Sequence, residues 1–315
     1  GPGWDGSLIL SNNARPVPAV VIGRNLTTAP TPKWLSWIGP WDLQVIWGQL
    51  EEERAVPNAR FFGMRFNFKP TDNFEFGISR TAQWCGDGRP CGWDTFWDMF
   101  LGRDNVGDAG ITPENEPGNQ MAGFDMRWTN MWFETPVSIY AQAIGEDEAG
   151  GWPSRYLVQA GIEGSVITRN HTSYRWFAEW AATSCDAIKS VVRYNCAYNQ
   201  AIYESGYTYY GRIIGHGLDN DARVLSAGVV VVTSTGNAWQ ILSRMGELNR
   251  DAPRADHSVA VVPTDLVSID LQHTRDTKFG RFDIGLGFER REEIATGDNT
   301  RDTRGFLRWQ HGWGG

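Results

Sequence analysis

The stretch RFDIGLGFE, Arg281–Glu289, alternates between two kinds of side chain at every residue. Apolar side chains occupy Phe282, Ile284, Leu286 and Phe288, and charged residues or glycine occupy the positions between them. Strict alternation is typical of a β-strand, because successive side chains point to opposite faces of a sheet. The stretch therefore predicts a strand with one apolar and one polar face.

The same alternation recurs along almost the whole chain and predicts an all-β protein. Thirteen strands are expected at residues 17–24, 40–49, 59–68, 73–81, 119–129, 134–144, 156–166, 172–182, 223–232, 238–244, 264–274, 279–290 and 304–313. A soluble sandwich is the alternative, but it would have to fit all these aromatic faces into one core about 10 Å thick. A transmembrane antiparallel β-barrel turns the apolar face to lipid and the polar face to a wet lumen. We therefore expect one outer-membrane barrel domain over residues 1–315.

Composition supports the same class of protein. The 16 tryptophans are numerous enough to supply girdles at both membrane interfaces. The net charge of −8 and the absence of a basic run argue against a nucleic-acid partner, because such binding needs cations to neutralise phosphates. No run of about 18 apolar residues occurs, so the sequence predicts no transmembrane helix.

The links between predicted strands differ in length. Short turns are expected at Lys69–Asn73, Thr129–Glu134, Ile167–Thr172, Thr233–Asn237 and Arg275–Phe279. Long links are expected at Gln83–Gly118, Gly145–Arg155, Met245–Val262 and Arg291–Thr303. Outer-membrane barrels place short turns at the periplasmic end and long loops outside, so the two kinds should alternate.

That alternation decides how Thr183–Ala222 should fold. Ser205–Gly215 could be another crossing strand, but a crossing there would break the order of short and long links. We therefore predict a single external excursion, which also places the pairs Cys85/Cys91 and Cys185/Cys196 on the same rim. Local disulfides in an oxidising compartment are favoured over zinc, since there is no C-x-x-C motif or nearby histidine pair.

The opening GPGWDGSLILSNNARPVP, residues 1–18, resembles a segment of the Wzi family of outer-membrane capsule-assembly proteins. Further similar stretches are TKFGRFDIGLGFERR (277–291), YTYYGRIIGHGLDNDA (207–222) and GELNRD (246–251). The resemblance covers the whole chain and corresponds to the C-terminal two-thirds of such a protein. It implies a barrel of about eighteen strands, of which about 13 or 14 lie in this chain. Single-chain bacterial barrels normally have an even number of strands, so the thirteen predicted strands also favour a missing N-terminal portion. The N-terminal strands, a helical region and a signal peptide would then be missing.

The resemblance also implies a function. It predicts a lectin-like protein of the bacterial outer membrane that attaches or organises capsular or other surface polysaccharide without catalysing a reaction. The expected contacts are polysaccharide and outer-membrane lipid, with no cofactor and no nucleic acid, and the expected state is a monomer.

Two predicted external segments carry side chains suited to sugars. The first, near the end of the excursion, offers Tyr207, Tyr209, Tyr210, Arg212, His216 and Asp219. Aromatic rings suit the C–H faces of sugars, whereas guanidinium and carboxylate groups suit hydroxyls. The alternative is that the tyrosines pack the loop and the acids cap turns. A calcium site at Asp219–Asn220–Asp221 is disfavoured, because the Gly and terminal Glu of a known calcium loop are absent.

The second candidate segment carries Trp93 and Trp97. Trp93, Trp97 and Leu101 recur at helical spacing, so a short amphipathic helix folded onto the barrel mouth is the competing interpretation.

Catalysis and conduction are the remaining functional alternatives. The five histidines fall in neither an H-E-x-x-H motif nor beside a G-x-S-x-G motif, so no enzyme is predicted. A general porin would use the same barrel and the same polar lumen. The expected lumenal charges are Arg65, Glu75, Asp125, Arg127, Glu163, Arg175, Glu179, Asp270, Arg281, Asp283 and Arg308. Their mixed signs favour ion pairs that fill the lumen, and the conductance of the protein in planar bilayers discriminates the two functions.

Overall fold

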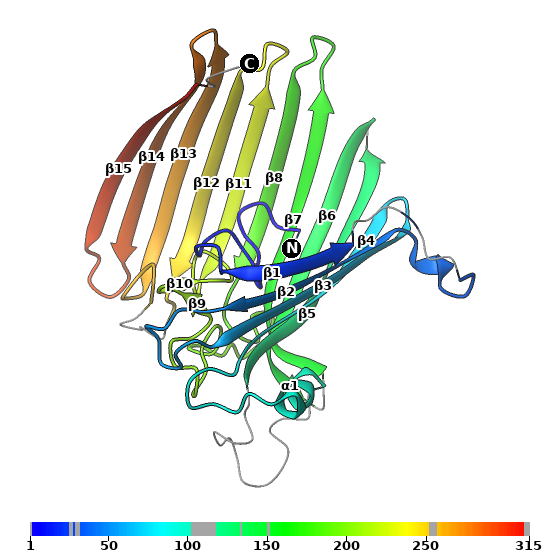
Figure 1. Cartoon of the computed structure of the whole chain (residues 1–315). Coiled ribbons are helices and arrows are strands. Elements are labelled where there is room, and N and C mark those ends of the chain that lie inside the picture. The colour runs from blue at the N-terminus through cyan, green and yellow to red at the C-terminus, as the bar shows by residue number, and fades with distance from the viewer. Residues whose placement is uncertain are drawn as a thin grey trace.

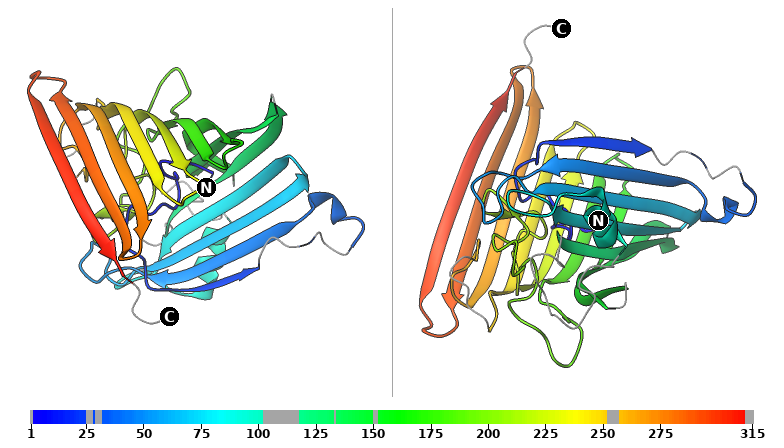
Figure 2. Two further views of the ribbon diagram at one scale, coloured as in Figure 1. Left: turned by 90° about the horizontal axis from the view of Figure 1, so that it is seen from above. Right: turned by 60° about the horizontal axis from the view of Figure 1, so that its bottom comes forward.

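The computed structural model describes residues 2–24, 28, 32–101, 118–132, 134–149, 152–251 and 257–311. Thirteen strands form one antiparallel sheet in which neighbours in the chain are neighbours in space (Figure 1). They are β1 Ala19–Arg24, β2 Trp41–Gln49, β3 Arg60–Thr71, β4 Phe74–Trp84, β5 Gly118–Trp132, β6 Thr135–Ala149, β7 Trp152–Ile167, β8 Ser173–Ala182, β11 Arg223–Val232, β12 Ala238–Leu248, β13 Thr264–Thr277, β14 Gly280–Glu293 and β15 Asn299–Gln310. The sheet curls around the start of the chain (Figure 2).

Four small elements complete the described fold. β9 Thr208–Tyr209 and β10 Arg212–Ile213 form a separate hairpin, whereas α1 Trp93–Phe100 and the 3-10 turn η1 Ser36–Ile38 are the helical elements of the described residues. No helix in this part of the chain is long and apolar enough to cross a membrane. The predicted all-β antiparallel class is confirmed, and each predicted crossing corresponds to one strand of the large sheet.

Two of the predicted long links are wrong in length. Backbone pairing continues through Asp147↔Ser154 in one hairpin and Glu292↔Asn299 in another, so the strands extend well into both links. The sequence pattern stopped at these places because polar residues replace the alternation. The backbone ladder has no such requirement and continues beyond the apolar band, because its hydrogen bonds do not depend on side-chain polarity.

The two faces of the sheet have opposite chemistry, as β14 shows. Leu286 on the outer face is 60% exposed, and Ile284 and Phe288 beside it are also exposed. On the inner face the Asp283 carboxylate is buried and accepts hydrogen bonds from Arg308 Nε at 2.9 Å and Thr274 Oγ1 at 2.5 Å. The predicted orientation of this strand is therefore confirmed, with its apolar side chains outward and its charges inward.

The outer face carries a continuous row of aromatic rings across β3, β4 and β5. Ring centroids lie 5.6 Å apart between Phe68 and Phe76 and 6.1 Å apart between Phe76 and Phe124. The inner face behind this row holds the ion pair of Arg65 with Asp125, whose Nη2–Oδ1 distance is 2.9 Å. Apolar atoms thus gather outside, whereas charges are paired inside.

The sheet has two unlike rims. The short-turn rim holds the tight connections that follow β3, at the right of Figure 1, and those that follow β7, β11 and β13, at the top. The long-loop rim, at the bottom, holds the links that follow β2, β4, β8 and β12. Because antiparallel neighbours alternate in direction, the strands return to the long-loop rim at every second link. The longest described connection, residues 183–222, lies there.

The outward position of Leu286 gives a quantitative prediction. Leu286→Arg should lower the free energy of unfolding in lipid vesicles by about 2–4 kcal/mol, because an arginine in the middle of the apolar band must face hydrocarbon. Phe279→Arg, in the exposed turn before β14, is the matched control and should cost about 1 kcal/mol or less. Urea titration followed by heat-modifiable gel mobility measures both. Equal effects of the two variants would mean that Leu286 does not face lipid.

Candidate functional site

Residues 183–222 form one excursion on the long-loop rim, as predicted. β8 and β11 pair directly with Ala182 opposite Arg223, so no strand of the sheet lies between them. The ends of the excursion are tied by a hydrogen bond from the Thr183 N–H to the Ala222 carbonyl, at 2.9 Å. The alternative of a crossing strand at Ser205–Gly215 is wrong, since this stretch forms only the β9–β10 hairpin.

Both predicted disulfides are present and lie on the same rim. Cys85 is bonded to Cys91, and Cys185 is bonded to Cys196. The Tyr203 hydroxyl, in the excursion beyond the second disulfide, donates a hydrogen bond to the carbonyl oxygen of Cys85 at 3.0 Å and so joins the excursion to the first disulfide loop.

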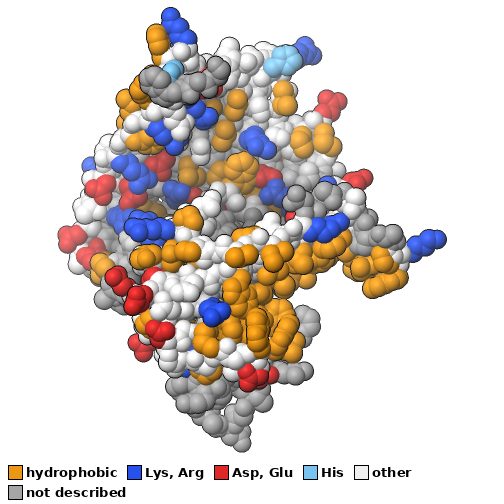
Figure 3. Space-filling model, in the orientation of Figure 1, with side chains coloured by type: hydrophobic (Ala, Val, Ile, Leu, Met, Phe, Trp, Pro, Cys, Tyr) orange, Lys and Arg blue, Asp and Glu red, His pale blue; other side chains and the backbone are white. Residues whose placement is uncertain are grey.

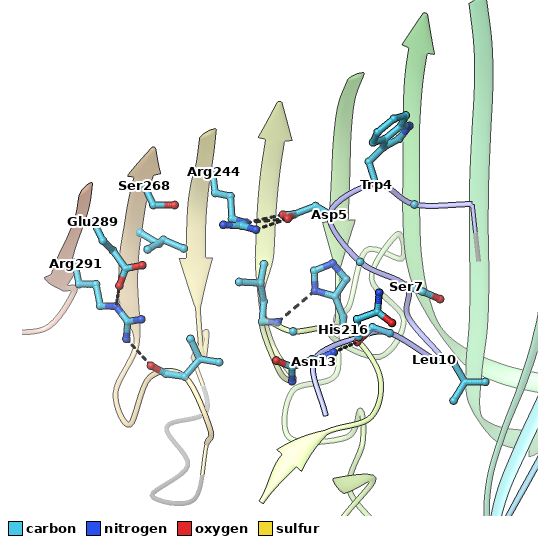
Figure 4. Close-up of a pocket in the computed structure, with 18 of the residues that line it drawn as sticks. Trp4, Asp5, Ser7, Leu10, Asn13, His216, Arg244, Ser268, Glu289 and Arg291 are labelled. Atoms are coloured by element: carbon cyan, nitrogen blue, oxygen red, sulfur yellow. Dashed lines mark hydrogen bonds and ion pairs between the residues drawn. The ribbon is translucent and has the colours of Figure 1, made fainter. Parts of the chain in front are cut away.

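A segment inside the curl of the sheet contacts the excursion from the lumenal side. This lumenal segment, Pro2–Asn13, crosses the inner face and bonds to side chains that point into the lumen (Figure 4). The Asp5 carboxylate accepts two hydrogen bonds from Arg244, with an Nε–Oδ2 distance of 2.7 Å. The Trp4 ring stacks on Phe177 with centroids 5.3 Å apart. Sequence reasoning missed this role, because the segment has no alternation and served only as a marker of family resemblance.

Two buried tyrosines connect the excursion to the lumenal segment. Tyr198 donates a hydrogen bond to the Leu8 carbonyl and Tyr207 donates one to the Ile9 carbonyl, both at 2.8 Å. Burial raises the pKa of both hydroxyls. Tyr207 is only 1% exposed, and its oxygen also bonds to Thr81 Oγ1 at 2.9 Å. The prediction that Tyr207 faces a ligand is therefore wrong: its ring and hydroxyl are already used in packing the loop.

His216 and Asp219 are also buried, which corrects their predicted place on the surface. The His216 ring lies against Gly6, where a Cβ would come within 3.0 Å of it. The Asp219 carboxylate accepts hydrogen bonds from the backbone N–H and hydroxyl of Ser258, both at 2.7 Å. Both side chains hold the excursion against neighbouring segments, and among the described residues no cluster of His, Cys, Asp and Glu fits a metal ion.

The accessible part of the predicted set lies at the tip of the β9–β10 hairpin. Tyr210 is 50% exposed, and the Arg15 guanidinium lies over its ring, 5.4 Å from the centroid. Arg212 is exposed two residues further on. Tyr209 is mostly buried and packs edge-on against Tyr210, with centroids 4.8 Å apart. The tip therefore presents one aromatic ring and two guanidinium groups to solvent.

A polar cavity of about 250 Å³ opens beside this hairpin. Its lining includes Glu51, Glu53, Asn199, Ser205 and Thr208. The Glu51 carboxylate accepts a hydrogen bond from the Tyr210 N–H at 3.1 Å, so the link between β2 and β3 positions the hairpin. Sequence analysis missed Glu51, Glu53 and Arg15. The run EEER at 51–54, between two alternating stretches, was the signal that could have identified this link as part of the mouth.

A larger cavity, of about 560 Å³, lies between the lumenal segment and strands β12–β15 (Figure 4). Its charged side chains are paired, either with one another or with Asp270 beside the cavity. Arg304 Nη2 lies 2.8 Å from Asp270 Oδ1, and Arg291 Nε lies 2.6 Å from Glu289 Oε1. Because these guanidinium groups already have carboxylate partners, a ligand entering here would have to displace an ion pair.

The buried His257 has a structural role, because both of its ring nitrogens bond to the backbone. His257 Nδ1 accepts hydrogen bonds from the N–H groups of Val259 and Ala260, so Nε2 carries the proton and donates to the Asn220 carbonyl at 3.0 Å. Both ring nitrogens are thus bonded to backbone, and neither is available to activate the neighbouring Ser258. A serine nucleophile needs a base that is free to accept its proton.

The two tryptophans of the second candidate segment lie elsewhere. The predicted short helix is confirmed as α1, but its predicted position over the mouth is wrong. Its buried residue Phe96 packs on Trp47 and Phe62, on the outer face of β2 and β3. The wall of the sheet therefore separates Trp93 and Trp97 from the β9–β10 hairpin, which packs against the inner face.

Comparison with known proteins identifies the family. The family model described as capsule assembly protein Wzi matches residues 1–298. The chain belongs to this family. A Klebsiella pneumoniae protein, described as an uncharacterized 55.8 kDa protein in the cps region, is 45% identical over 168 residues, which cover 52% of this chain and 32% of that protein. The solved structure of Wzi from Escherichia coli matches with a TM-score of 0.82 and 29% identity, covering 98% of this chain and 65% of that one.

These matches establish the setting of the fold. The E. coli structure is described as an outer-membrane protein involved in group 1 capsule assembly and as a carbohydrate-binding β-barrel. The present chain is likewise an outer-membrane β-barrel protein of the Wzi family, and it spans less than two thirds of either relative's length. In such barrels the rim with short turns is periplasmic and the rim with long loops is external.

His216 makes the stability of the external mouth depend on pH. Burial lowers its pKa to about 4, an effect that Arg244 adds to and Asp5 opposes. Its Nδ1 accepts a hydrogen bond from the Leu218 N–H at 3.4 Å, which also favours the neutral ring. The unfolded chain binds a proton near pH 6.5, so the stability contribution is complete above that pH and is lost as the pH falls toward 4.

We therefore expect His216 to account for about 2–3 kcal/mol of the stability lost between pH 7 and pH 4.5. His216→Gln should reduce that loss by this amount, as measured by urea midpoints at the two pH values. His171→Gln, in the exposed turn between β7 and β8, is the matched control and should leave the loss unchanged. An unchanged loss in His216→Gln would show that other groups govern the acid sensitivity.

Proposed function

We propose that the protein containing this chain binds capsular or a related surface polysaccharide at the outer face of the outer membrane and holds it there. The external position of the β9–β10 hairpin supports this proposal, as does membership of the Wzi family. The described carbohydrate binding of the E. coli relative supports it further. The polymer would lie across the mouth, where it can be reached from outside the cell.

The observation that carries the proposal is the exposed ring of Tyr210 beside Arg212 and a polar cavity. A tyrosine ring offers a flat apolar surface to the C–H face of a sugar, and its hydroxyl remains solvated. A guanidinium group pairs with two hydroxyls or with the carboxylate of an acidic sugar. The exposed carboxylate of Glu53, which lines this cavity, accepts hydrogen bonds from further hydroxyls. This combination fits a neutral or mildly acidic polysaccharide.

The proposal includes binding without catalysis. Hydrolysis of a glycosidic bond ordinarily needs two carboxyl groups that flank the bond, one of them protonated. Glu51 is already bonded to the Tyr210 N–H and lies 3.5 Å from Arg54. Both carboxylate oxygens of Glu51 therefore already have protein partners, whereas a general acid must be free to approach the glycosidic oxygen.

Removal of the exposed groups should weaken binding while the barrel remains folded. Tyr210→Ala and Arg212→Ala should each reduce retention of purified capsular polysaccharide by about 5- to 10-fold, or about 1–1.4 kcal/mol. Phe279→Ala, an exposed aromatic on the opposite rim, serves as the matched control. Heat-modifiable gel mobility verifies folding of all three variants. Full retention by the folded Tyr210→Ala/Arg212→Ala double variant would contradict this site.

The porin alternative predicts a different result in planar bilayers. The lumenal segment and the excursion occupy the described lumen. Ion pairs such as that between Arg308 and Asp283 pair the charges on its wall. We therefore expect the full-length protein to show no steady conductance. A stable open level in most insertions would instead support a channel.

A further inference from the structure

The helix α1 packs against the outer wall of the barrel at its external end. Phe96 is the centre of this contact, with ring centroids 5.4 Å from Phe62 and 5.2 Å from Trp84. Phe62 faces outward, because the preceding Phe61 faces inward and packs on Tyr207, 6.1 Å away. The helix therefore stands on the side of the wall that faces lipid in the membrane.

A guanidinium group on the wall contacts the underside of the helix. Arg80 lies on the outer face of β4, where the neighbouring outward residues Ile78 and Ala82 are apolar. Arg80 Nη2 donates a hydrogen bond to the carbonyl oxygen of Met99 at 2.9 Å, and its guanidinium lies 5.4 Å from the centroid of the Phe100 ring. The helix thus covers a charge that hydrocarbon would solvate poorly.

The solvent-facing half of α1 is itself divided into two stripes. Trp93, Trp97 and Leu101 form one stripe at four-residue spacing, and they are 66%, 52% and 51% exposed. Asp94 and Asp98 form the adjacent stripe, one position further around the helix, and they are exposed as well. Since consecutive residues are about 100° apart around the axis, the apolar stripe and the acidic stripe face different directions.

Such an arrangement matches a helix that lies in the plane of a membrane interface. With its buried side on the wall, α1 turns its tryptophans to one side and its carboxylates to the other. The tryptophan stripe continues the apolar surface of the lipid-facing strands, where Ile78 and Phe124 are exposed. Figure 3 shows a large cluster of hydrophobic side chains on the lower right of the molecule. Tryptophan is enriched where apolar and wet layers meet, because its ring is amphipathic.

We propose that α1 is an interfacial anchor. Its tryptophan stripe is immersed at the boundary between headgroups and acyl chains of the outer leaflet, and Asp94 and Asp98 face the aqueous side. The partner is a lipid surface that continues the lipid contact of β2–β5. The anchor fixes the height of the mouth above the membrane on this side of the barrel. This inference rests on the outer-membrane location and not on polysaccharide binding.

Photo-crosslinking in intact outer membranes tests the anchor. The full-length protein would carry p-benzoylphenylalanine in place of Trp97, in cells whose lipid acyl chains bear an alkyne tag. We expect tagged lipid adducts at least fivefold above those of the Asp98→p-benzoylphenylalanine variant, which differs by one helix position. Phe124→p-benzoylphenylalanine, on the lipid-facing wall, is the positive control, and His171→p-benzoylphenylalanine, in a short turn, is the aqueous control.

Three outcomes would overturn the proposal. Lipid adducts at position 97 no more frequent than at position 98, with the Phe124 control positive, would place the stripe in water. Adducts at twice the mass of the chain would instead identify a second copy as the occupant, and adducts of another mass would identify a different protein.

A second measurement compares the insertion of Trp93→Gln/Trp97→Gln with that of Asp94→Asn/Asp98→Asn. We expect only the first pair to lower, by twofold or more, the rate of insertion into lipid vesicles, and equal rates would contradict the anchor.

Discussion

The ion pair between Asp5 and Arg244 is the interaction on which the external mouth depends. It holds the lumenal segment across the inner face of the sheet, with an Nη2–Oδ1 distance of 2.5 Å. Once held, this segment offers the carbonyl oxygens of Leu8 and Ile9 to two buried tyrosines of the excursion. Because a buried charge without its partner is strongly destabilising, the pair has a large effect on where the segment can lie. The position of the excursion at the mouth therefore depends on an ion pair inside the lumen.

The same division of chemistry runs through the rest of the molecule. Inside, carboxylates and guanidinium groups satisfy one another, as Arg65 and Asp125 do. Outside, aromatic rings form a continuous surface toward lipid, as Phe76 and Phe124 do. A one-residue slip of any strand would exchange the two faces, because side chains alternate with a period of two. Membrane and lumen together thus select a single register, whereas the loops at the rim are not constrained by this alternation.

The sequence predicted the sheet well because period-two alternation is a local property. β11 was located to the residue, whereas β6, β7, β14 and β15 differ from prediction mainly where their polar hairpins continue beyond the apolar band. The candidate site was harder to predict, since burial depends on contacts between segments far apart in the chain. Tyr207 and Tyr210 lie three residues apart and are the same residue type, yet one is buried beneath the loop and the other is exposed. The spacing of its apolar residues predicted the helix α1, but it did not predict which face of the sheet the helix covers.

The bonds that close the mouth connect the two ends of a long assembly process. Tyr198 and Leu8 are 190 residues apart, and Tyr207 and Ile9 are 198 residues apart. Contacts of such high sequence separation form slowly, because the entropy of closing the intervening chain is lost before the contact stabilises anything. Strands β1 to β8 lie between these partners in the chain. The contacts that complete the external mouth are therefore expected to form late in assembly, because they need two segments that are far apart in the chain.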